Sequence, residues 1–245
     1  MNYSKVLFLD TETTSLDPTI ASIRELAYVK EVNGKQVGDI QSYKISPIIH
    51  YEDQLYCDQT ITDFCRDYNK KFHDQDPDRL GMFSFPGGEP LFFYSKAVLT
   101  FNVTPPDILN PADWLLGTDK VQPRSAIMDL IEYLTEDNVP GRWILAGHNV
   151  KYDFDVITYW AKRVLGADAK MLLDKFNKYV FLDTLALSRW FQYSGRLKTD
   201  KANLGAVAGE LGIDVSDMHS ANADVFASKE IARILLSKEY IDDNR

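Results

Sequence analysis

Cysteine and long apolar runs are scarce in this sequence. Its 245 residues include only two cysteines, Cys57 and Cys65, which excludes a disulfide framework and favours a reducing compartment. No apolar run approaches the roughly 18 residues that suggest a membrane-spanning helix. We therefore expect a cytoplasmic protein with no membrane partner. We also expect no cleavable signal peptide, because a candidate functional strand already starts at Lys5.

A net positive charge is also missing. The 27 Lys and Arg residues face 36 Asp and Glu residues, and the formal net charge of −9 argues against broad, non-specific nucleic-acid binding. The charge is unevenly spread, because residues 142–201 hold 11 basic and 6 acidic residues. This segment predicts either a local basic surface or ordinary solvated helix faces.

The composition is that of an ordinary folded protein, with 45% hydrophobic and 26% charged residues. Its length suits one large domain or two small ones. We expect a single domain, 1–245, with an aromatic-rich insertion at about 48–95. The insertion contains both cysteines, flanked by His50 and His73. These four residues predict either a structural zinc site with unusual spacing or simply small buried cysteines.

The stretch KVLFLDTETTSL, residues 5–16, is the most informative part of the chain. Four apolar residues lead into Asp10-Thr11-Glu12, and such a run predicts a strand buried on both faces. Because side chains alternate along a strand, Asp10 and Glu12 point to the same side. Two adjacent carboxylates repel each other unless one is protonated or a hard cation such as Mg²⁺ lies between them. The alternative is that these residues simply begin a polar loop.

The rest of the chain alternates between strand and helix patterns. Two β-like runs, 22–32 and 35–46, flank Asn33-Gly34, which is a strong hairpin signal. Further strands are expected at 143–146 and 179–183. Amphipathic patterns predict the helices, which are expected at 124–136, 151–165, 184–192, 203–211 and 220–238.

Two of the expected helices carry an aspartate on their buried stripe. Asp153 lies four residues before Ile157, and Asp224 lies seven residues before Ile231. For Asp153 alone, the favourable interaction with the helix dipole is a sufficient explanation. His219 lies just before the last helix, where a histidine is either a polar cap or a functional group.

Together these residues form a chemically coherent set. Four buried carboxylates, those of Asp10, Glu12, Asp153 and Asp224, require compensating cations. Two divalent ions about 4 Å apart would satisfy them, in the arrangement that stabilises attacking and leaving oxygens in phosphoryl transfer. A histidine such as His219, with an ordinary pKa near 6.5, is suited to deprotonate water at neutral pH.

Three separated motifs resemble those of the DEDDh, or DnaQ-like, 3′→5′ exonuclease family. They are FLDTETTSL at 8–16, GHNVKYD at 147–153 and HSANAD at 219–224. Their order matches, and a histidine five residues before the last aspartate marks the histidine subtype. The segments IRELA at 23–27, FLDT at 181–184 and NLGAVAGELGI at 203–213 are also similar to family segments. The resemblance covers the chain except for about 48–95.

The resemblance implies an α/β, ribonuclease H-like fold with a mixed five-stranded sheet flanked by helices. It implies that two Mg²⁺ or Mn²⁺ ions are bound by Asp10, Glu12, Asp153 and Asp224. It also implies that His219 is the general base. The residues implied to contact the terminal nucleotide are Thr13, Leu16, His148, Asn149 and Tyr152, with Leu16 against the base and Thr13 near the sugar.

Two positions depart from the family pattern. Ser15 replaces the usual glycine after the Thr-Thr pair, and Tyr152 stands where phenylalanine is common. The serine bears on how closely the backbone meets the 3′ end. Neither residue is an implied metal ligand.

We therefore expect a metal-dependent 3′→5′ exonuclease that releases nucleoside monophosphates from single-stranded DNA ends. RNA, as in oligoribonucleases, is the alternative substrate. A different alternative is a proofreading subunit that acts within a polymerase complex and docks through the insertion. Within the basic segment, Trp190, Phe191 and Tyr193 predict either stacking surfaces for bases or the end of a core helix.

Overall fold

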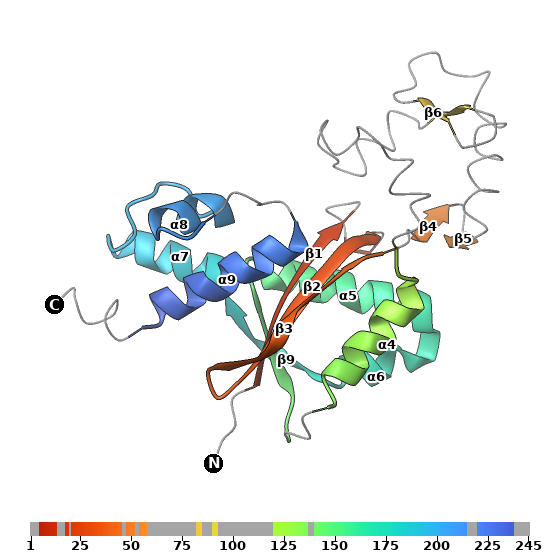
Figure 1. Ribbon diagram of the computed structural model, residues 1–245, viewed down its shortest axis with the longest axis horizontal. Helices are drawn as coiled ribbons and strands as arrows, with labels where there is room; N and C mark the ends of the chain where they lie inside the picture. Colours follow the sequence, from red (N-terminus) through yellow and green to blue (C-terminus); the bar gives the residue numbers. More distant parts are fainter. Residues whose placement is uncertain are drawn as a thin grey trace.

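The computed structural model describes residues 5–13, 18–19, 21–45, 120–136, 140–214 and 220–237, together with the backbone of four short strands between residues 48 and 92. Its centre is a five-stranded sheet with the strand order β3-β2-β1-β8-β9 (Figure 1). The strands are β1 (Lys5–Thr13), β2 (Ile23–Val32), β3 (Lys35–Lys44), β8 (Trp143–Gly147) and β9 (Phe176–Asp183). β1, β2 and β3 pair antiparallel, whereas β8 and β9 run parallel to β1. The predicted mixed five-stranded sheet is confirmed.

The β2–β3 hairpin forms where Asn33-Gly34 predicts it. Asn33 has φ 55° and Gly34 has φ 73°, and Val32 pairs directly with Lys35. Two positive φ values in a two-residue loop match the right-handed twist of the flanking strands. The turn chemistry therefore sets the register of this edge of the sheet.

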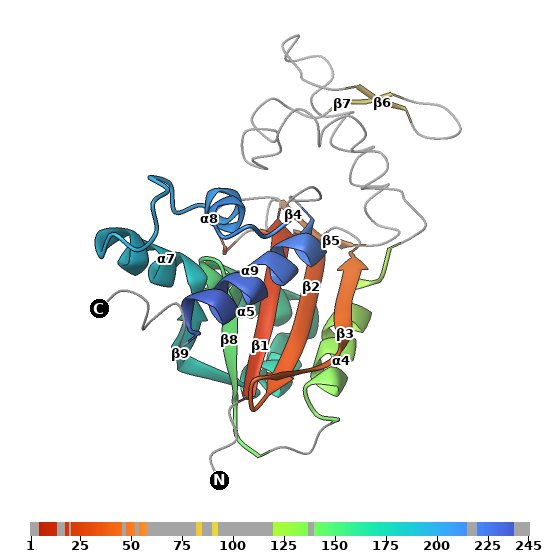
Figure 2. The same cartoon turned by 60° about the vertical axis from the view of Figure 1, so that its left-hand side comes forward.

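The two faces of the sheet are covered by different helices (Figures 1 and 2). The helices are α4 (Pro123–Tyr133), α5 (Val150–Leu165), the 3-10 turn η2 (Gly166–Ala169), α6 (Lys170–Leu173), α7 (Thr184–Tyr193), α8 (Leu204–Glu210) and α9 (Ala221–Leu235). On one face, Leu7 and Leu9 of β1 pack in a core with α4 and α5. On the other face, Phe8 packs with α9, which also contacts α7 and α8. The alternation of β1 thus divides its side chains between two cores.

The segment between the third strand and α4 contains two short antiparallel pairs. β4 (Ile48–Tyr51) pairs with β5 (Gln54–Cys57), and β6 (Met82–Ser84) pairs with β7 (Pro90–Phe92). The side chains of the predicted insertion at 48–95, including those of the zinc alternative, lie outside the described residues, and the single-domain assignment stays a prediction. Within the described ranges, no helix combines the length and apolar character needed to cross a bilayer.

β8 meets β1 at a backbone contact that leaves no room for a side chain. A Cβ added at Gly147, the last residue of β8, would lie 2.7 Å from the carbonyl oxygen of Leu9. Leu9 directly precedes Asp10, so this contact fixes the spacing of the two strand ends that carry the polar motifs.

We expect Gly147→Ala to lower the free energy of unfolding by about 1–3 kcal/mol, because the methyl group must push the two strands apart. The matched control is Gly209→Ala in α8, where an added Cβ meets nothing within 4 Å. That change should be neutral or stabilise by about 0.5–1 kcal/mol, since alanine is the better helix former. Urea unfolding of both variants measures the difference, and equal effects would contradict the close approach.

Candidate active site

The candidate site forms where β1 ends. Asp10 and Glu12 lie on the same face of the strand as Phe8, which is the face covered by α9. Asp10 is paired with Ala27 of β2, and the register between the two strands shifts only after Glu12. The regular pairing with β2 therefore holds both carboxylates side by side.

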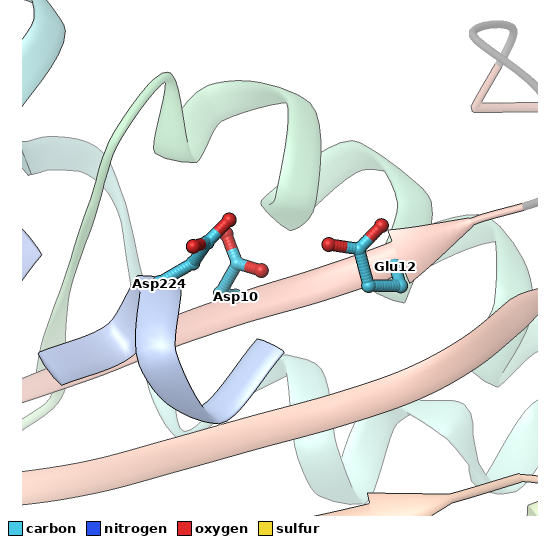
Figure 3. Close-up of side chains that lie close together, drawn as sticks. All are labelled: Asp10, Glu12 and Asp224. Carbon is cyan, nitrogen blue, oxygen red and sulfur yellow. The ribbon is translucent and has the colours of Figure 1, made fainter. Parts of the chain in front are cut away.

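The third carboxylate comes from the first turn of α9. Ser220 caps this helix, because its hydroxyl accepts a hydrogen bond from the backbone N–H of Ala223 at 3.3 Å. The next residue, Asp224, thereby faces the end of β1. Ligand oxygens of Asp10, Glu12 and Asp224 all lie within 4.8 Å of one another. Figure 3 shows the three side chains on the same side of β1, two from the strand and one from the helix beside it.

The electrostatics of this group are unfavourable for three bare carboxylates. Burial raises the pKa of Asp10 well above its ordinary value, and the negative charges of Asp153, Asp224 and Glu12 raise it further. A cation among these oxygens would relieve both the desolvation and the repulsion. Carboxylate oxygens at this spacing suit a hard divalent ion.

Asp153 lies next to this group but is held differently. It is 4% exposed in the first turn of α5, on the opposite side of β1 from α9. Its Oδ1 accepts two hydrogen bonds from Thr11, one from the backbone N–H at 3.0 Å and one from the hydroxyl at 2.7 Å. Burial raises the pKa of Asp153 to about 7, although the bonds from Thr11 oppose the rise.

Thr11 is a residue whose role the sequence patterns do not predict. It follows Leu9 by two positions, so it points to the α5 face while its neighbours Asp10 and Glu12 point to the α9 face. The strand alternation contains this signal, but only the placement of α5 turns it into a contact with Asp153. Thr11 fixes one oxygen of that carboxylate, and so sets the direction of the other.

The turn between β8 and α5 is held by the end of β9. Asn149, the residue before α5, is exposed and left-handed, with φ 67°. Its backbone N–H donates to Oδ1 of Asp183 at 3.0 Å. The same oxygen accepts from the backbone N–H of Leu185 at 2.9 Å and so caps α7. One carboxylate, which sequence patterns leave without a role, thus connects two helix starts.

His148 is half-buried in the same turn. Its Nδ1 lies 3.0 Å from the hydroxyl of Thr184, and that hydroxyl donates to the carbonyl of Gly147 at 3.1 Å. Because Thr184 donates to Gly147, it accepts from Nδ1–H of the histidine. Burial lowers the pKa of His148, which favours this neutral ring.

Thr13 and Tyr152, both predicted to contact substrate, contact each other. The hydroxyls of the two residues are 2.7 Å apart and join the end of β1 to the start of α5. Of the sequence-predicted site residues, Asp10, Glu12 and Asp224 form one group, and Asp153, Thr13, His148, Asn149 and Tyr152 lie on the adjoining elements. Leu16 and His219 lie outside the described residues.

The sheet order and the helices on both faces define a ribonuclease H-like α/β fold. The structures that it resembles include those of exonuclease I. The Escherichia coli enzyme in complex with a dT13 oligonucleotide matches at a TM-score of 0.57 and 17% identity, over 98% of this chain and 43% of that chain. A moderately thermophilic exonuclease I from Methylocaldum szegediense matches at a TM-score of 0.55 and 16% identity, over 99% of this chain and 41% of that chain.

The likeness is one of fold. The chain spans less than half the length of the exonuclease I chains that it matches. No family model matches the sequence, and a sequence comparison with curated proteins finds no match. The residue-level interpretation therefore depends on the site geometry of this chain.

We expect Mg²⁺ or Mn²⁺ to raise the Tm of the wild type, because an ion at a hundred times its Kd contributes about 2.7 kcal/mol. Asp10→Asn removes one charge from the crowded group. Without metal ions this variant should be more stable than the wild type, and it should lose most of the metal-dependent rise. Thermal unfolding in EDTA and with each ion measures both effects.

Asp39→Asn on β3 is the matched control, because Asp39 is exposed and distant from the carboxylate group in the sheet order. It should respond to the ions as the wild type does. An equal metal-dependent rise in Asp10→Asn and the wild type would contradict a cation site at this position.

Proposed function

We propose that this protein is a metal-dependent 3′→5′ exonuclease that acts on single-stranded DNA. The observation that supports it most directly is the group of Asp10, Glu12 and Asp224 at the end of the central strand, with Asp153 beside it. The resemblance of the three sequence motifs to the DEDDh family points to the same chemistry. The fold likeness to exonuclease I in complex with dT13 and with dA16 oligonucleotides favours DNA over RNA.

The residues present fit divalent ions. The donor set consists of carboxylate oxygens within 4.8 Å of one another, and burial together with like charges raises the pKa of Asp10. Asp10, Glu12, Asp153 and Asp224 would hold two Mg²⁺ or Mn²⁺ ions. When bound, such ions supply Lewis-acid stabilisation of the charge on the attacking and leaving oxygens.

The reaction would be hydrolysis of the last phosphodiester bond. We assign His219 as the base that takes a proton from the attacking water, because it precedes the cap of α9 and lies five residues before Asp224. The water oxygen bonds to phosphorus, the bond from phosphorus to the 3′ oxygen breaks, and that oxygen takes up a proton. The products are a nucleoside 5′-monophosphate and a strand shortened by one nucleotide.

The chain's other residues would position the end of the strand. Asn149 is exposed in a left-handed conformation fixed by Asp183, so its side chain is available to a ligand. Thr13 and Tyr152 form a hydroxyl pair next to Glu12, and we assign this pair to the terminal sugar. His148, held by Thr184, and Leu16 complete the proposed contacts with the terminal nucleotide.

A time course on one sequence as single-stranded DNA, single-stranded RNA and duplex DNA, each with a 5′ label, tests the proposal. With Mg²⁺ the wild type should produce a ladder that shortens from the 3′ end, fastest on single-stranded DNA. Asp10→Asn should slow cleavage by at least about a hundredfold, because the stabilisation lost is several kcal/mol.

Asp39→Asn should cut at the wild-type rate. Faster cleavage of RNA than of DNA would change the assigned substrate to RNA and leave the assigned reaction unchanged. Undiminished cleavage by Asp10→Asn in Mg²⁺ would overturn the assignment of the carboxylate group.

A further inference from the structure

Two exposed aromatic side chains lie together on the outer face of α7. Trp190 is 63% exposed and Tyr193 is 88% exposed, and their ring centroids are 6.4 Å apart with 32° between the ring planes. Of the two interpretations of this aromatic run, the core alternative holds for Phe191, which is 5% exposed and packs with Leu204 and Val207. Trp190 and Tyr193, which we call the aromatic pair, therefore differ from their neighbour in being exposed to solvent.

The aromatic pair lies on a helix that is held in place by packing and by hydrogen bonds. The opposite side of α7 is buried through Thr184, Ser188 and Phe191. Directly after the helix, the backbone N–H groups of Arg196 and Leu197 donate to the carbonyl of Phe191 at 2.9 and 3.1 Å. The backbone of α7 is already ordered before a ligand covers the pair, and this lowers the entropic cost of binding.

The loop that follows α7 brings positive charge beside the pair. The side-chain amide of Gln192 donates to the carbonyl of Thr199 at 2.8 Å. The backbone N–H groups of Lys198 and Thr199 both donate to the carboxylate of Glu210 in α8. These bonds fold residues 194–203 back along α7, and Asp200 is the one acidic residue within them.

Residues 189–201 hold four basic residues and one acidic residue, against seven and five in the rest of the segment 142–201. In that rest, Lys151 pairs with Asp155 and Lys170 pairs with Asp174. Arg189, Lys198 and Lys201 are exposed, and none of them takes part in the ion pairs between described residues. Arg196 lies in the same loop, where it is half-buried and its guanidinium carbon is 5.8 Å from the ring centroid of Phe191. In a protein of net charge −9, these cations form a local basic patch, in which Asp200 and Glu210 are the nearby carboxylates.

The region adjoins the candidate active site. α7 begins at Thr184, which is bonded to His148. α7 therefore starts directly at the candidate active-site turn. At 1.5 Å per residue, the pair lies about 9 and about 14 Å along the helix axis from Thr184.

We propose that Trp190 and Tyr193 form a stacking platform for the bases of a single strand that leads to the active site, with Arg189, Arg196, Lys198 and Lys201 facing its phosphates. The platform rests on the proposed function, since it extends the path of the same substrate. Exposed aromatic side chains beside positive charge are what sequence-tolerant single-strand binding uses. An apolar protein partner would not need the surrounding cations.

The platform should matter only for strands long enough to reach it. A dinucleotide that occupies the carboxylate site extends only one nucleotide beyond the terminal one, whereas an oligonucleotide of about 12 nucleotides is long enough to cover the pair. We expect Trp190→Ala/Tyr193→Ala to raise KM for the long strand at least about tenfold, since each stacked base contributes that order of affinity. The change in KM for a dinucleotide should be much smaller.

Binding is measured separately in EDTA, where no cleavage occurs, by titrating a labelled 12-nucleotide strand and a dinucleotide. The conservative variant Trp190→Phe/Tyr193→Phe should restore affinity, because phenylalanine keeps a stacking face. Tyr179→Ala on β9 is the matched control, because Tyr179 is 89% exposed and lies outside α7 and its loop. Lys198→Ala/Lys201→Ala should reduce the salt dependence of binding by about 0.7 in log–log slope for each phosphate that the variant no longer neutralises.

The outcomes separate the two proposals. Loss of long-strand affinity in the alanine variant, with recovery in the phenylalanine variant, supports the platform even if the wild type cleaves nothing. Wild-type affinity in the alanine variant overturns the platform even if cleavage is confirmed. Equal losses for the dinucleotide and the long strand also overturn it, because they place the defect at the carboxylate site.

Discussion

The crowding of negative charge at the end of β1 is the constraint on which the site depends. Asp10 is surrounded by Asp153, Asp224 and Glu12, in a place where burial already disfavours its charged form. Such an arrangement opposes folding unless the cost is offset by a bound cation or by proton uptake. β1, the helices α5 and α9, and the β8–β9 edge all contribute backbone or side-chain groups that hold these carboxylates in place. The fold holds several like charges close together at the end of β1. Such crowding is typical of functional sites and not of hydrophobic cores.

The alternation of β1 distributes that charge over two faces. Asp10 and Glu12 meet Asp224 on the α9 face, whereas Thr11 meets Asp153 on the α5 face. A carboxylate with two bonds from Thr11 to one oxygen has a defined orientation, although it lies outside the group of three. The remaining oxygen of Asp153 could therefore coordinate an ion without a change of the side-chain rotamer. Orientation is supplied by a residue that itself has no charge.

Much of this arrangement could be predicted from the sequence, because its signals are local. Asn33-Gly34 determines the hairpin, the apolar run determines β1, and the buried stripes of α5 and α9 place Asp153 and Asp224 inward. The roles of Thr11 and Asp183 could not be predicted, because each depends on which strand end meets which turn. Which aromatic side chains of residues 190–193 are exposed could not be predicted for the same reason. A helix pattern alone does not decide which of three adjacent rings faces α8 and α9.

α7 connects the turn between β8 and α5 with the aromatic pair. Its first residues, Asp183 at the cap and Thr184 after it, fix the turn that carries His148 and Asn149. Its last turn carries the aromatic pair, about two helical turns further on. Because a helix is stiff over this length, a base stacked on Tyr193 and a nucleotide at the β8–α5 turn would be held at a constant separation. A shift of α7 would then disturb the candidate active-site turn and the proposed platform together. Substitutions of the pair should leave the turn in place, since both rings project away from the buried face that anchors the helix.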